Sequence, residues 1–314
     1  MTSKQQQEQR VVILGTGGTI AGRAQQATDN VGYKAAELGV EQLVAAVPAL
    51  AQYRIEARQV AQLDSKDMDF ATWQLLARAV TAELERADVA GLVITHGTDT
   101  LEETAWFLQR VLAPTKPVVL TAAMRPATAI NADGPQNLLD AVCVASDRYA
   151  SGVLVAFAGS VHEAAQVRKV HSYRVDAFAS AEGARVGVVE EGAARWLLRT
   201  SLPAPAVGLT RIARDPAAWP RVQIVMNHAG ADGSIVQALL AQGVDGIVVA
   251  GTGNGTVSTG MEAALREAQS RGVRVLRSTR CDAGPVMDLP GSLPSAGALS
   301  PVKARIELLL DLLA

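Results

Sequence analysis

VVILGTGGTI at residues 11–20 and GLVITHGTDT at residues 91–100 share one layout, an apolar run that ends on glycines and threonines. Each predicts a buried strand followed by a tight turn, where glycine lets the backbone come close to a small ligand. In an open α/β sheet, ligands bind beyond the carboxyl ends of the strands. An ordinary strand-to-helix connection explains one such turn. Two turns with hydroxyls at the same place, Thr19 and Thr98, favour a shared site that includes Asp99.

Similar apolar runs alternate with helical patterns along the rest of the chain. Further strands are predicted at residues 117–122, 152–157, 222–226, 246–250 and 273–276, and helices at 69–87, 101–112 and 137–147. Strands that alternate with helices indicate an α/β fold with a mostly parallel sheet. We expect Asp69 or Asp67 to cap the first of these helices, and Ser300 to cap a last helix that begins at Pro301.

The length of the chain predicts two domains. At 314 residues it is at the size where a single hydrophobic core stops growing. Residues 197–220 contain four prolines and no clear periodicity, which is typical of a linker. We therefore predict a larger N-terminal domain over residues 1–196, with a mostly parallel sheet flanked by helices, and a smaller parallel α/β domain over residues 221–314.

The composition favours a cytoplasmic enzyme. Charged residues make up 19% of the chain, and 29 basic against 31 acidic side chains give a net charge of -2. A nucleic-acid partner would need a basic face, and the longest basic run is Arg168-Lys169. No apolar run is long enough for a membrane partner, and the polar residues 1–10 do not resemble a signal peptide. The two cysteines, Cys143 and Cys281, provide no disulfide framework.

The glycine-rich turns do not fit a nucleotide or metal site. The spacing GxGxxG fails at Ile20 in the first turn and at Thr256 in a third turn, GTGNGT. The four histidines are not at metal-ligand spacings, so we expect no metal and no cofactor. The GxSxG motif of serine hydrolases is absent. A threonine hydroxyl remains as nucleophile, and it needs a nearby base and backbone N–H groups that stabilise an oxyanion.

The segments TGGTIAG at 16–22 and THGTDTLEETA at 95–105 resemble the two signature segments of the bacterial L-asparaginase and glutaminase-asparaginase family. The similarity continues through AMRP at 123–126, ADGP at 132–135 and GTGNG at 251–255, so it covers nearly the whole chain. This resemblance implies a two-domain α/β enzyme that hydrolyses the side-chain amide of L-asparagine, and of L-glutamine more weakly, without a cofactor.

The resemblance also implies the catalytic residues. Thr19 matches the nucleophile that attacks the amide carbon, and Tyr33, near the end of a mobile lid over residues 23–39, polarises or deprotonates it. Thr98, Asp99 and Lys169 match a second cluster, in which the lysine activates Thr98 or the attacking water and Asp99 also binds the substrate ammonium. From the residues alone, a lysine in this context is more often a solvated surface residue, and Tyr33 could equally pack the lid.

Three more residues match substrate-binding positions. Ser65 corresponds to the residue that binds the substrate α-carboxylate, and Ala123 to one whose carbonyl contacts the leaving amide. Asn254 corresponds to a contact from a neighbouring subunit, which implies a homotetramer with sites at subunit interfaces. The alternatives from local sequence are a helix cap for Ser65 and sheet packing for Ala123.

The chain departs from the family pattern at two places. Lys66 stands where members usually have glutamine, which predicts either tighter binding of the α-carboxylate or repulsion of the α-ammonium. The family often completes its site with a glutamate from a neighbouring subunit, but residues 278–300 contain none. Either Asp282 or Asp288 substitutes for it, or the contact is missing.

Two functions from other classes stay open. A non-catalytic binding protein for acidic amino acids would keep the pocket but release no ammonia. An amidase subunit of a tRNA-dependent amidotransferase resembles this family over the same core. Such subunits usually carry an extra N-terminal domain, whereas the first predicted strand here begins at Val11.

Overall fold

The computed structural model describes residues 9–181, 185–200 and 205–313. The chain divides into two compact units, Met1–Leu209 and Thr210–Ala314, and each has its own sheet. The predicted linker is described only in part, because its residues 201–204, which include Pro203, lie outside the described residues. After it, Val207 donates its N–H to the Arg110 carbonyl at 2.8 Å, so this stretch is bonded to the first unit. Most of the polar opening predicted over residues 1–10 also lies outside the described residues.

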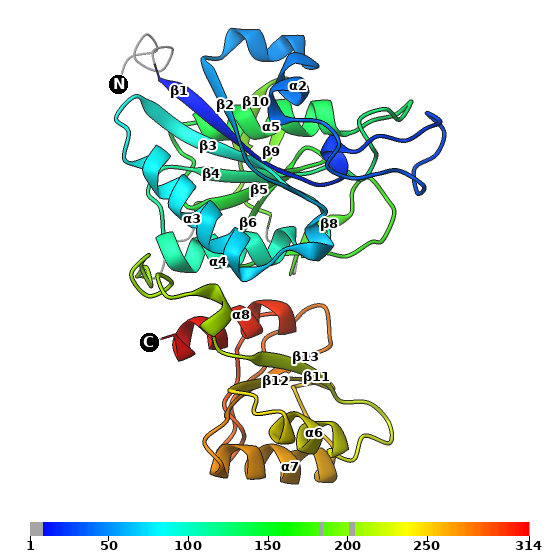
Figure 1. The fold of residues 1–314 in the computed structure, drawn as a ribbon, viewed down its shortest axis with the longest axis vertical. Coiled ribbons are helices and arrows are strands. Elements are labelled where there is room, and N and C mark those ends of the chain that lie inside the picture. Colours follow the sequence, from blue (N-terminus) through cyan, green and yellow to red (C-terminus); the bar gives the residue numbers. More distant parts are fainter. Residues whose placement is uncertain (1–8, 182–184, 201–204, 314) are drawn as a thin grey trace. The chain divides into compact units, whose positions relative to one another are not determined.

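The first unit is built on an 8-stranded sheet in the order β10-β9-β6-β5-β4-β3-β1-β2 (Figure 1). The strands from β2 to β5 run parallel, which confirms the predicted parallel sheet. The strands β6, β9 and β10 pair antiparallel and were not predicted. The bounds are β1 Arg10–Gly17, β2 Ile55–Leu63, β3 Val89–Thr95, β4 Val118–Thr121, β5 Val153–Phe157, β6 Ser160–Glu163, β9 Gly187–Glu190 and β10 Ala193–Trp196.

Helices cover both faces of this sheet. Figure 1 shows α2 and α5 on one face and α3 and α4 on the other. The helices are α2 Val40–Ala45, α3 Phe70–Leu84, α4 Leu101–Leu112 and α5 Gly134–Ser146. In the sheet β1 lies between β2 and β3. The connection from β1 to β2 runs toward one edge, and the following strands β3, β4 and β5 run toward the other, so the strand order reverses between β1 and β3. Ligand sites of doubly wound sheets lie at such a switch point.

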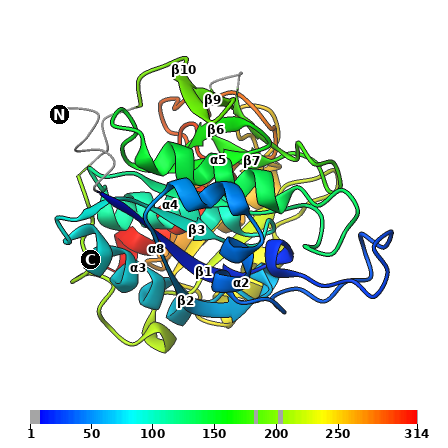
Figure 2. The same cartoon turned by 90° about the horizontal axis from the view of Figure 1, so that it is seen from above.

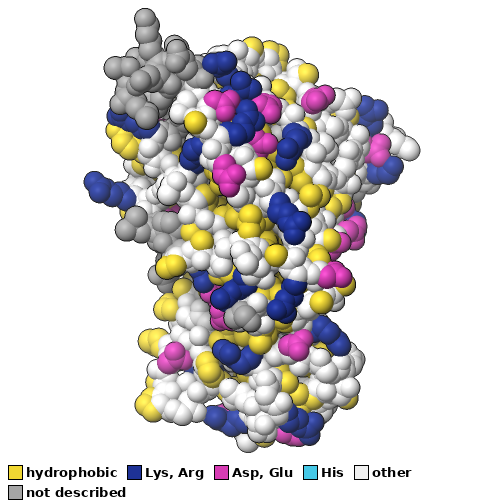
Figure 3. All heavy atoms as spheres, turned by 60° about the vertical axis from the view of Figure 1, so that its left-hand side comes forward, with side chains coloured by type: hydrophobic (Ala, Val, Ile, Leu, Met, Phe, Trp, Pro, Cys, Tyr) yellow, Lys and Arg dark blue, Asp and Glu magenta, His cyan; other side chains and the backbone are white. Residues whose placement is uncertain are grey.

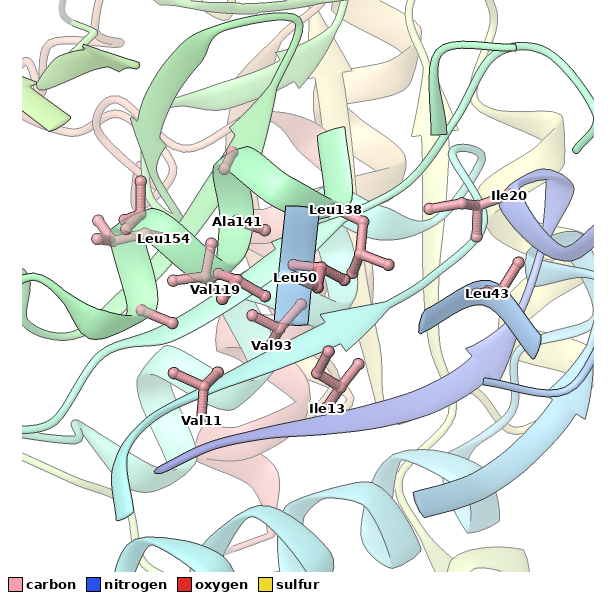
Figure 4. Packing of buried hydrophobic residues seen from close by; sticks show 14 of the residues in the cluster. Val11, Ile13, Ile20, Leu43, Leu50, Val93, Val119, Leu138, Ala141 and Leu154 are labelled. Carbon is pink, nitrogen blue, oxygen red and sulfur yellow. The ribbon is translucent and has the colours of Figure 1, made fainter. Parts of the chain in front are cut away.

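The core between the sheet and α5 holds the switch point in place (Figure 4). Val11 and Ile13 of β1 pack with Val93 of β3, and Leu138 and Ala141 of α5 cover them. All five side chains are at most 2% exposed. Burying one such aliphatic side chain stabilises a fold by about 1.5–3 kcal/mol, so the strands that carry both threonine turns are rigidly supported.

Short elements follow the strands at their carboxyl ends. The 3-10 helix η1, Thr19–Ala21, comes after β1, and η3, Ser65–Asp67, comes after β2. A separate hairpin of β7, Val167–Lys169, and β8, Phe178–Ser180, is antiparallel. Two further 3-10 helices within the described residues are η2 Pro48–Gln52 and η5 Pro216–Ala218.

The second unit is a three-stranded parallel sheet in the order β11-β12-β13, as predicted. Its elements are β11 Val222–Met226, α6 Ser234–Ala241, β12 Gly246–Gly251, α7 Thr259–Ser270, β13 Arg274–Thr279 and α8 Pro301–Leu312. The side chains of Val225, Ile247 and Val249 pack with α6 and α7 to form its core.

Of the two predicted capping residues, Asp69 makes a capping hydrogen bond and Ser300 does not. Asp69 caps α3, since its carboxylate accepts the Thr72 N–H, so the choice between Asp69 and Asp67 is settled. Ser300 stands at the N-cap position of α8, as predicted, although its hydroxyl makes no capping hydrogen bond. The start of α8 rests instead on Pro301, whose ring fixes a helical φ in the first turn.

On the face drawn in Figure 3, basic and acidic side chains are interspersed, as the near-equal numbers of each in the sequence would give. No helix within the described part of the chain combines the length and the apolar character needed to cross a membrane. Both cysteines are free thiols, Cys143 buried and Cys281 exposed.

Candidate active site

Three loops meet beyond the carboxyl ends of β1, β2 and β3. A Cβ on Gly18, whose φ is +80°, would lie 2.3 Å from Gly97 Cα, and a Cβ on Gly97 would lie 2.4 Å from Ser65 Oγ. Real Cβ atoms do not approach other heavy atoms this closely. Glycine is therefore required at both positions, and it brings the turn after β1 into contact with the turn after β3.

We expect Gly97→Ala to destabilise the first unit by about 1–3 kcal/mol, the usual cost of overpacking a filled site. The added methyl group must displace Ser65, which is 2% exposed and cannot swing into solvent. Urea unfolding measures the change. Gly39→Ala is the control, because φ at Gly39 is -75° and its Cβ would meet nothing closer than 3.9 Å. Equal unfolding midpoints for the two variants would refute the steric argument.

Thr19 begins η1 directly after the glycine turn. Its Oγ1 lies 2.7 Å from Tyr33 Oη, and either atom can be the donor. Thr19 is 8% exposed, so this hydroxyl pair is largely shielded from water. The Tyr33 ring also contacts Gly22, where a Cβ would lie 2.9 Å from ring atom Cδ2. The structure thus joins the first two residues of the predicted catalytic set.

Tyr33 is carried by the segment of residues 23–39, which extends outward beyond β1 in Figures 1 and 2 (dark blue). Backbone hydrogen bonds between Arg23 and Lys34, at 2.9 and 3.0 Å, close the segment into a loop. Ala24 donates its N–H to Thr128 Oγ1, and the Ile130 N–H donates to the Ala27 carbonyl. The loop is therefore anchored to residues 127–130.

Lys169 ends β7 and reaches the turn after β3. Its Nζ donates to Thr98 Oγ1 at 2.9 Å and to Asp99 Oδ1 at 2.6 Å. The Lys169 side chain is only 19% exposed, so it is not the solvated surface residue that local sequence favours. Its backbone N–H is fixed by Glu102 Oε1 at 3.1 Å, which sets the position of the lysine relative to α4.

Both clusters line one cavity of about 200 Å³. Five of the predicted residues contribute to it: Thr19, Tyr33, Thr98, Asp99 and Lys169. Five others were not predicted: Asn30, Val31, Met124, Ser172 and Tyr173. Each of these five lies within four residues of a predicted site residue in the sequence, and this closeness is the feature by which they could have been found. The cavity has room for a small polar molecule, and its lining includes the Thr19–Tyr33 hydroxyl pair and the Thr98–Lys169 hydroxyl–ammonium pair.

Ser65 and Lys66 stand beside the cavity rather than among its lining residues. Ser65 Oγ accepts the Asp99 N–H at 3.2 Å, so Ser65 supports the turn that carries Asp99. It does not cap α3, because Asp69 does. Lys66 Nζ donates to Asp64 Oδ2 at 2.7 Å and to Asp67 Oδ2 at 3.2 Å, and these hydrogen bonds raise the pKa of Lys66.

The loop after β4 holds Ala123, which is fully buried, and is braced by residues that we assigned no role from the sequence. The Asp133 carboxylate accepts the N–H groups of Met124 and Arg125, both at 2.9 Å. Asn137 Nδ2 donates to the Ala122 carbonyl at 2.9 Å. Burial raises the pKa of Asp133, and the two N–H donors act in the opposite direction. The ADGP motif thus shapes the wall that includes Met124.

Asn254 belongs to the second unit. Its carboxamide accepts the Met287 N–H at 2.7 Å and donates to the Met287 carbonyl at 3.2 Å. Asp288, one of two carboxylates considered as a substitute for a missing glutamate, lies 3.6 Å from Arg277. The other, Asp282, is exposed.

The arrangement suits acyl transfer to a hydroxyl. One threonine hydroxyl is paired with a phenol, and a second is paired with an ammonium that is held by a carboxylate. Among the residues that the structure describes, no group of three or more His, Cys, Asp or Glu side chains is placed to hold a metal ion.

Comparisons with known proteins cover almost the entire chain. Family models described as "Asparaginase, N-terminal" and "Glutaminase/Asparaginase C-terminal domain" match residues 10–201 and 221–313. The chain is 38% identical to a glutaminase-asparaginase of Pseudomonas fluorescens over 94% of this chain and 84% of that protein. It is 37% identical to L-asparaginase 2 of Escherichia coli over 96% and 88% of the two chains.

A solved structure gives the same result. The probable cytoplasmic L-asparaginase from Campylobacter jejuni superposes with a TM-score of 0.90 at 37% identity, covering 97% of this chain and 95% of that one. Together with the family models, this shows that the chain belongs to the asparaginase and glutaminase-asparaginase family of amidohydrolases.

Proposed function

We propose that this protein is an L-asparaginase in which Thr19 is the nucleophile of a covalent acyl-enzyme mechanism. The observation that carries the proposal is the 2.7 Å contact of Thr19 Oγ1 with Tyr33 Oη inside the cavity. A threonine alcohol is a weak nucleophile, so it needs a partner that removes its proton during attack. Tyr33 is the partner within hydrogen-bond distance.

The first half-reaction forms the acyl-enzyme. Thr19 Oγ1 bonds to the amide carbon of asparagine, and its proton passes to Tyr33 Oη, which gives its own proton to the amide nitrogen. The carbon–nitrogen bond then breaks and ammonia leaves. The Gly18 N–H already donates to the Leu63 carbonyl at 3.0 Å, so we assign stabilisation of the oxyanion to other backbone N–H groups next to Thr19. Such a contribution is worth on the order of 10²–10³ in rate per donor.

The second half-reaction releases aspartate. A water molecule held by Thr98 Oγ1 and Lys169 Nζ attacks the ester carbon, the bond to Thr19 Oγ1 breaks, and a proton from the water restores the hydroxyl. Lys169 Nζ lies 2.9 Å from Thr98 Oγ1, which is the hydrogen bond this role needs. Asp99 Oδ1 holds the lysine at 2.6 Å, and its half-exposed carboxylate also binds the substrate ammonium.

The size of the cavity supports a small amino acid as substrate. At about 200 Å³ it has room for asparagine. Ser65 and Ala123 are not among the residues that line it, and we propose for them the roles that the family resemblance implies: a hydrogen bond from Ser65 to the α-carboxylate, and acceptance by the Ala123 carbonyl from the leaving amide. Glutamine is longer by one methylene, which pockets distinguish by about 1–3 kcal/mol. Glutamine is therefore a weaker substrate in this proposal.

Purified protein should release ammonia from L-asparagine with kcat/KM about 10- to 200-fold higher than from L-glutamine. Coupled glutamate dehydrogenase detection of ammonia measures both rates. Aspartate binding by calorimetry, run in parallel, separates the possible outcomes. Binding of aspartate without ammonia release from either amide would identify a binding protein instead of an amidohydrolase.

The proposal extends to assembly and location. We propose a homotetramer in which Asn254 of one subunit reaches the site of another, and a monomeric mass by light scattering at catalytic concentrations would contradict it.

We also propose a cytoplasmic location. The names of relatives differ on this point, since the Haemophilus influenzae relative is named a probable periplasmic L-asparaginase and the Campylobacter jejuni protein a probable cytoplasmic one. Fractionation of the source cells decides between the compartments.

A further inference from the structure

His96 is buried beside the cavity, and no step of the proposed mechanism uses it. It directly follows β3, two residues before Thr98, and is 0% exposed. Its Nδ1 lies 2.7 Å from the Gly97 carbonyl oxygen, and its Nε2 lies 3.0 Å from Thr104 Oγ1 on α4. Thr104 Oγ1 in turn accepts the indole N–H of Trp73 on α3 at 2.9 Å.

The Trp73 indole and the Gly97 carbonyl stand at the two ends of this series of hydrogen bonds, and their chemistry determines which atom donates in each bond. An indole N–H can only donate, and a carbonyl oxygen can only accept. Thr104 therefore accepts from Trp73 and donates its own proton to His96 Nε2, which leaves Nδ1 as the protonated nitrogen. Burial lowers the pKa of His96 to about 4, so the ring is neutral at physiological pH and carries this one proton.

The Nδ1–H group of His96 donates a hydrogen bond to the carbonyl of the Gly97–Thr98 peptide. A peptide is planar and trans, so holding the Gly97 carbonyl toward the ring directs the Thr98 N–H to the opposite side. Glycine restrains its own ψ angle less than any other residue, so Gly97 cannot set this orientation by itself. Thr98 Oγ1 must also stay within 2.9 Å of Lys169 Nζ, which is anchored on β7.

We propose that His96 is a positioning residue, which orients the Gly97–Thr98 peptide so that Thr98 meets Lys169 in the second half-reaction. This inference rests on the proposed function, in which Thr98 and Lys169 hold the attacking water. His96 does not touch the substrate in this role. Its influence on turnover passes through the backbone of the residue next to Thr98.

Two substitutions of similar size test the two hydrogen bonds of His96, to Gly97 and to Thr104, separately. In His96→Asn the side-chain amide nitrogen occupies the place of Nδ1 and can still donate to the Gly97 carbonyl. In His96→Gln the amide reaches the place of Nε2, so the bond to Thr104 is kept and the bond to Gly97 is lost. Each variant loses one buried hydrogen bond, so their unfolding midpoints should be similar.

We expect kcat for asparagine to fall by about 10²-fold in His96→Gln, the cost of misplacing a catalytic group by about 1 Å. In His96→Asn it should fall only a few-fold. Because only the second half-reaction is slowed, KM for asparagine should fall together with kcat in His96→Gln, and kcat/KM should change little. Trp73→Phe is the control. It removes the outermost donor, which lowers stability, but leaves Thr104 able to donate to His96, so kcat should not change.

Equal kcat values for the Asn and Gln variants, or a loss in Trp73→Phe as large as in His96→Gln, would overturn the proposal. An inactive wild-type enzyme would instead overturn the proposed function, so the two failures are distinguishable. A second measurement does not depend on the variants being active. In ¹⁵N spectra of the wild type, the signals lost in His96→Asn should show protonated Nδ1 and bare Nε2, unchanged between pH 5.5 and pH 8; protonated Nε2 would contradict the inference.

Discussion

Thr19→Ala is expected to lower kcat for asparagine by about 10⁴-fold or more, as removal of the attacking hydroxyl does in other acyl-enzyme hydrolases. In the proposed mechanism this substitution deletes the atom that forms the ester, and it leaves Tyr33 without the hydroxyl that it contacts at 2.7 Å. Water is a poor replacement, because an amide is a less reactive acyl group than the ester that water attacks in the second half-reaction. Ammonia release under saturating asparagine measures the loss.

Thr19→Ser is the matched control for this experiment. It keeps the hydroxyl and removes only a methyl group, so its kcat should stay far above that of the alanine variant. Calorimetric titration with aspartate shows whether the alanine variant still has an intact cavity. If that variant binds aspartate normally and also hydrolyses asparagine at the wild-type rate, Thr19 is not the nucleophile.

Lys169→Met should lower kcat by about 10²–10⁴-fold, the range for loss of a general acid–base group. The methionine side chain has nearly the length and volume of lysine, but it has no proton to share with Thr98 and no charge to bind Asp99. Because Lys169 holds the water of the second half-reaction in the proposed mechanism, the acyl-enzyme should accumulate. Intact-protein mass spectrometry after mixing with asparagine would detect it as an added aspartyl group.

Lys116→Met is the control for Lys169. Lys116 lies in the same unit, and its Nζ donates to the Leu84 and Arg86 carbonyls rather than to cavity residues. It should lower stability and leave kcat unchanged. Turnover by Lys169→Met at the rate of the Lys116 variant would remove Lys169 from the mechanism.

The parts of the fold that were predictable are those whose local pattern agrees with their tertiary environment. Residues 101–112 have helical spacing, a favourable first turn and a buried face, and α4 has these same bounds. The strands β1 and β3 are continuous apolar runs because they are covered on both faces, which is how buried parallel strands read in sequence. The glycine turns then located Thr19 and Thr98 without further information.

The remaining features depend on contacts between residues far apart in the chain. The strands β6, β9 and β10 are short, and pairing with neighbours rather than local propensity makes them strands. Lys169 reads as a surface residue until Thr98 and Asp99, about 70 positions earlier, are brought beside it. Likewise nothing near Asp133 in sequence shows that its carboxylate binds the backbone of Met124 and Arg125.

The glycine-to-glycine contact of Gly18 with Gly97 limits where this protein can change. Neither position has room for a side chain, so mutational libraries that include them would mostly sample destabilised variants. Three other lining residues, Asn30, Val31 and Ser172, lie on loops with exposed neighbours and have no such restriction. Substrate preference can therefore be evolved through these loops, while the turns that carry the two threonines stay constant.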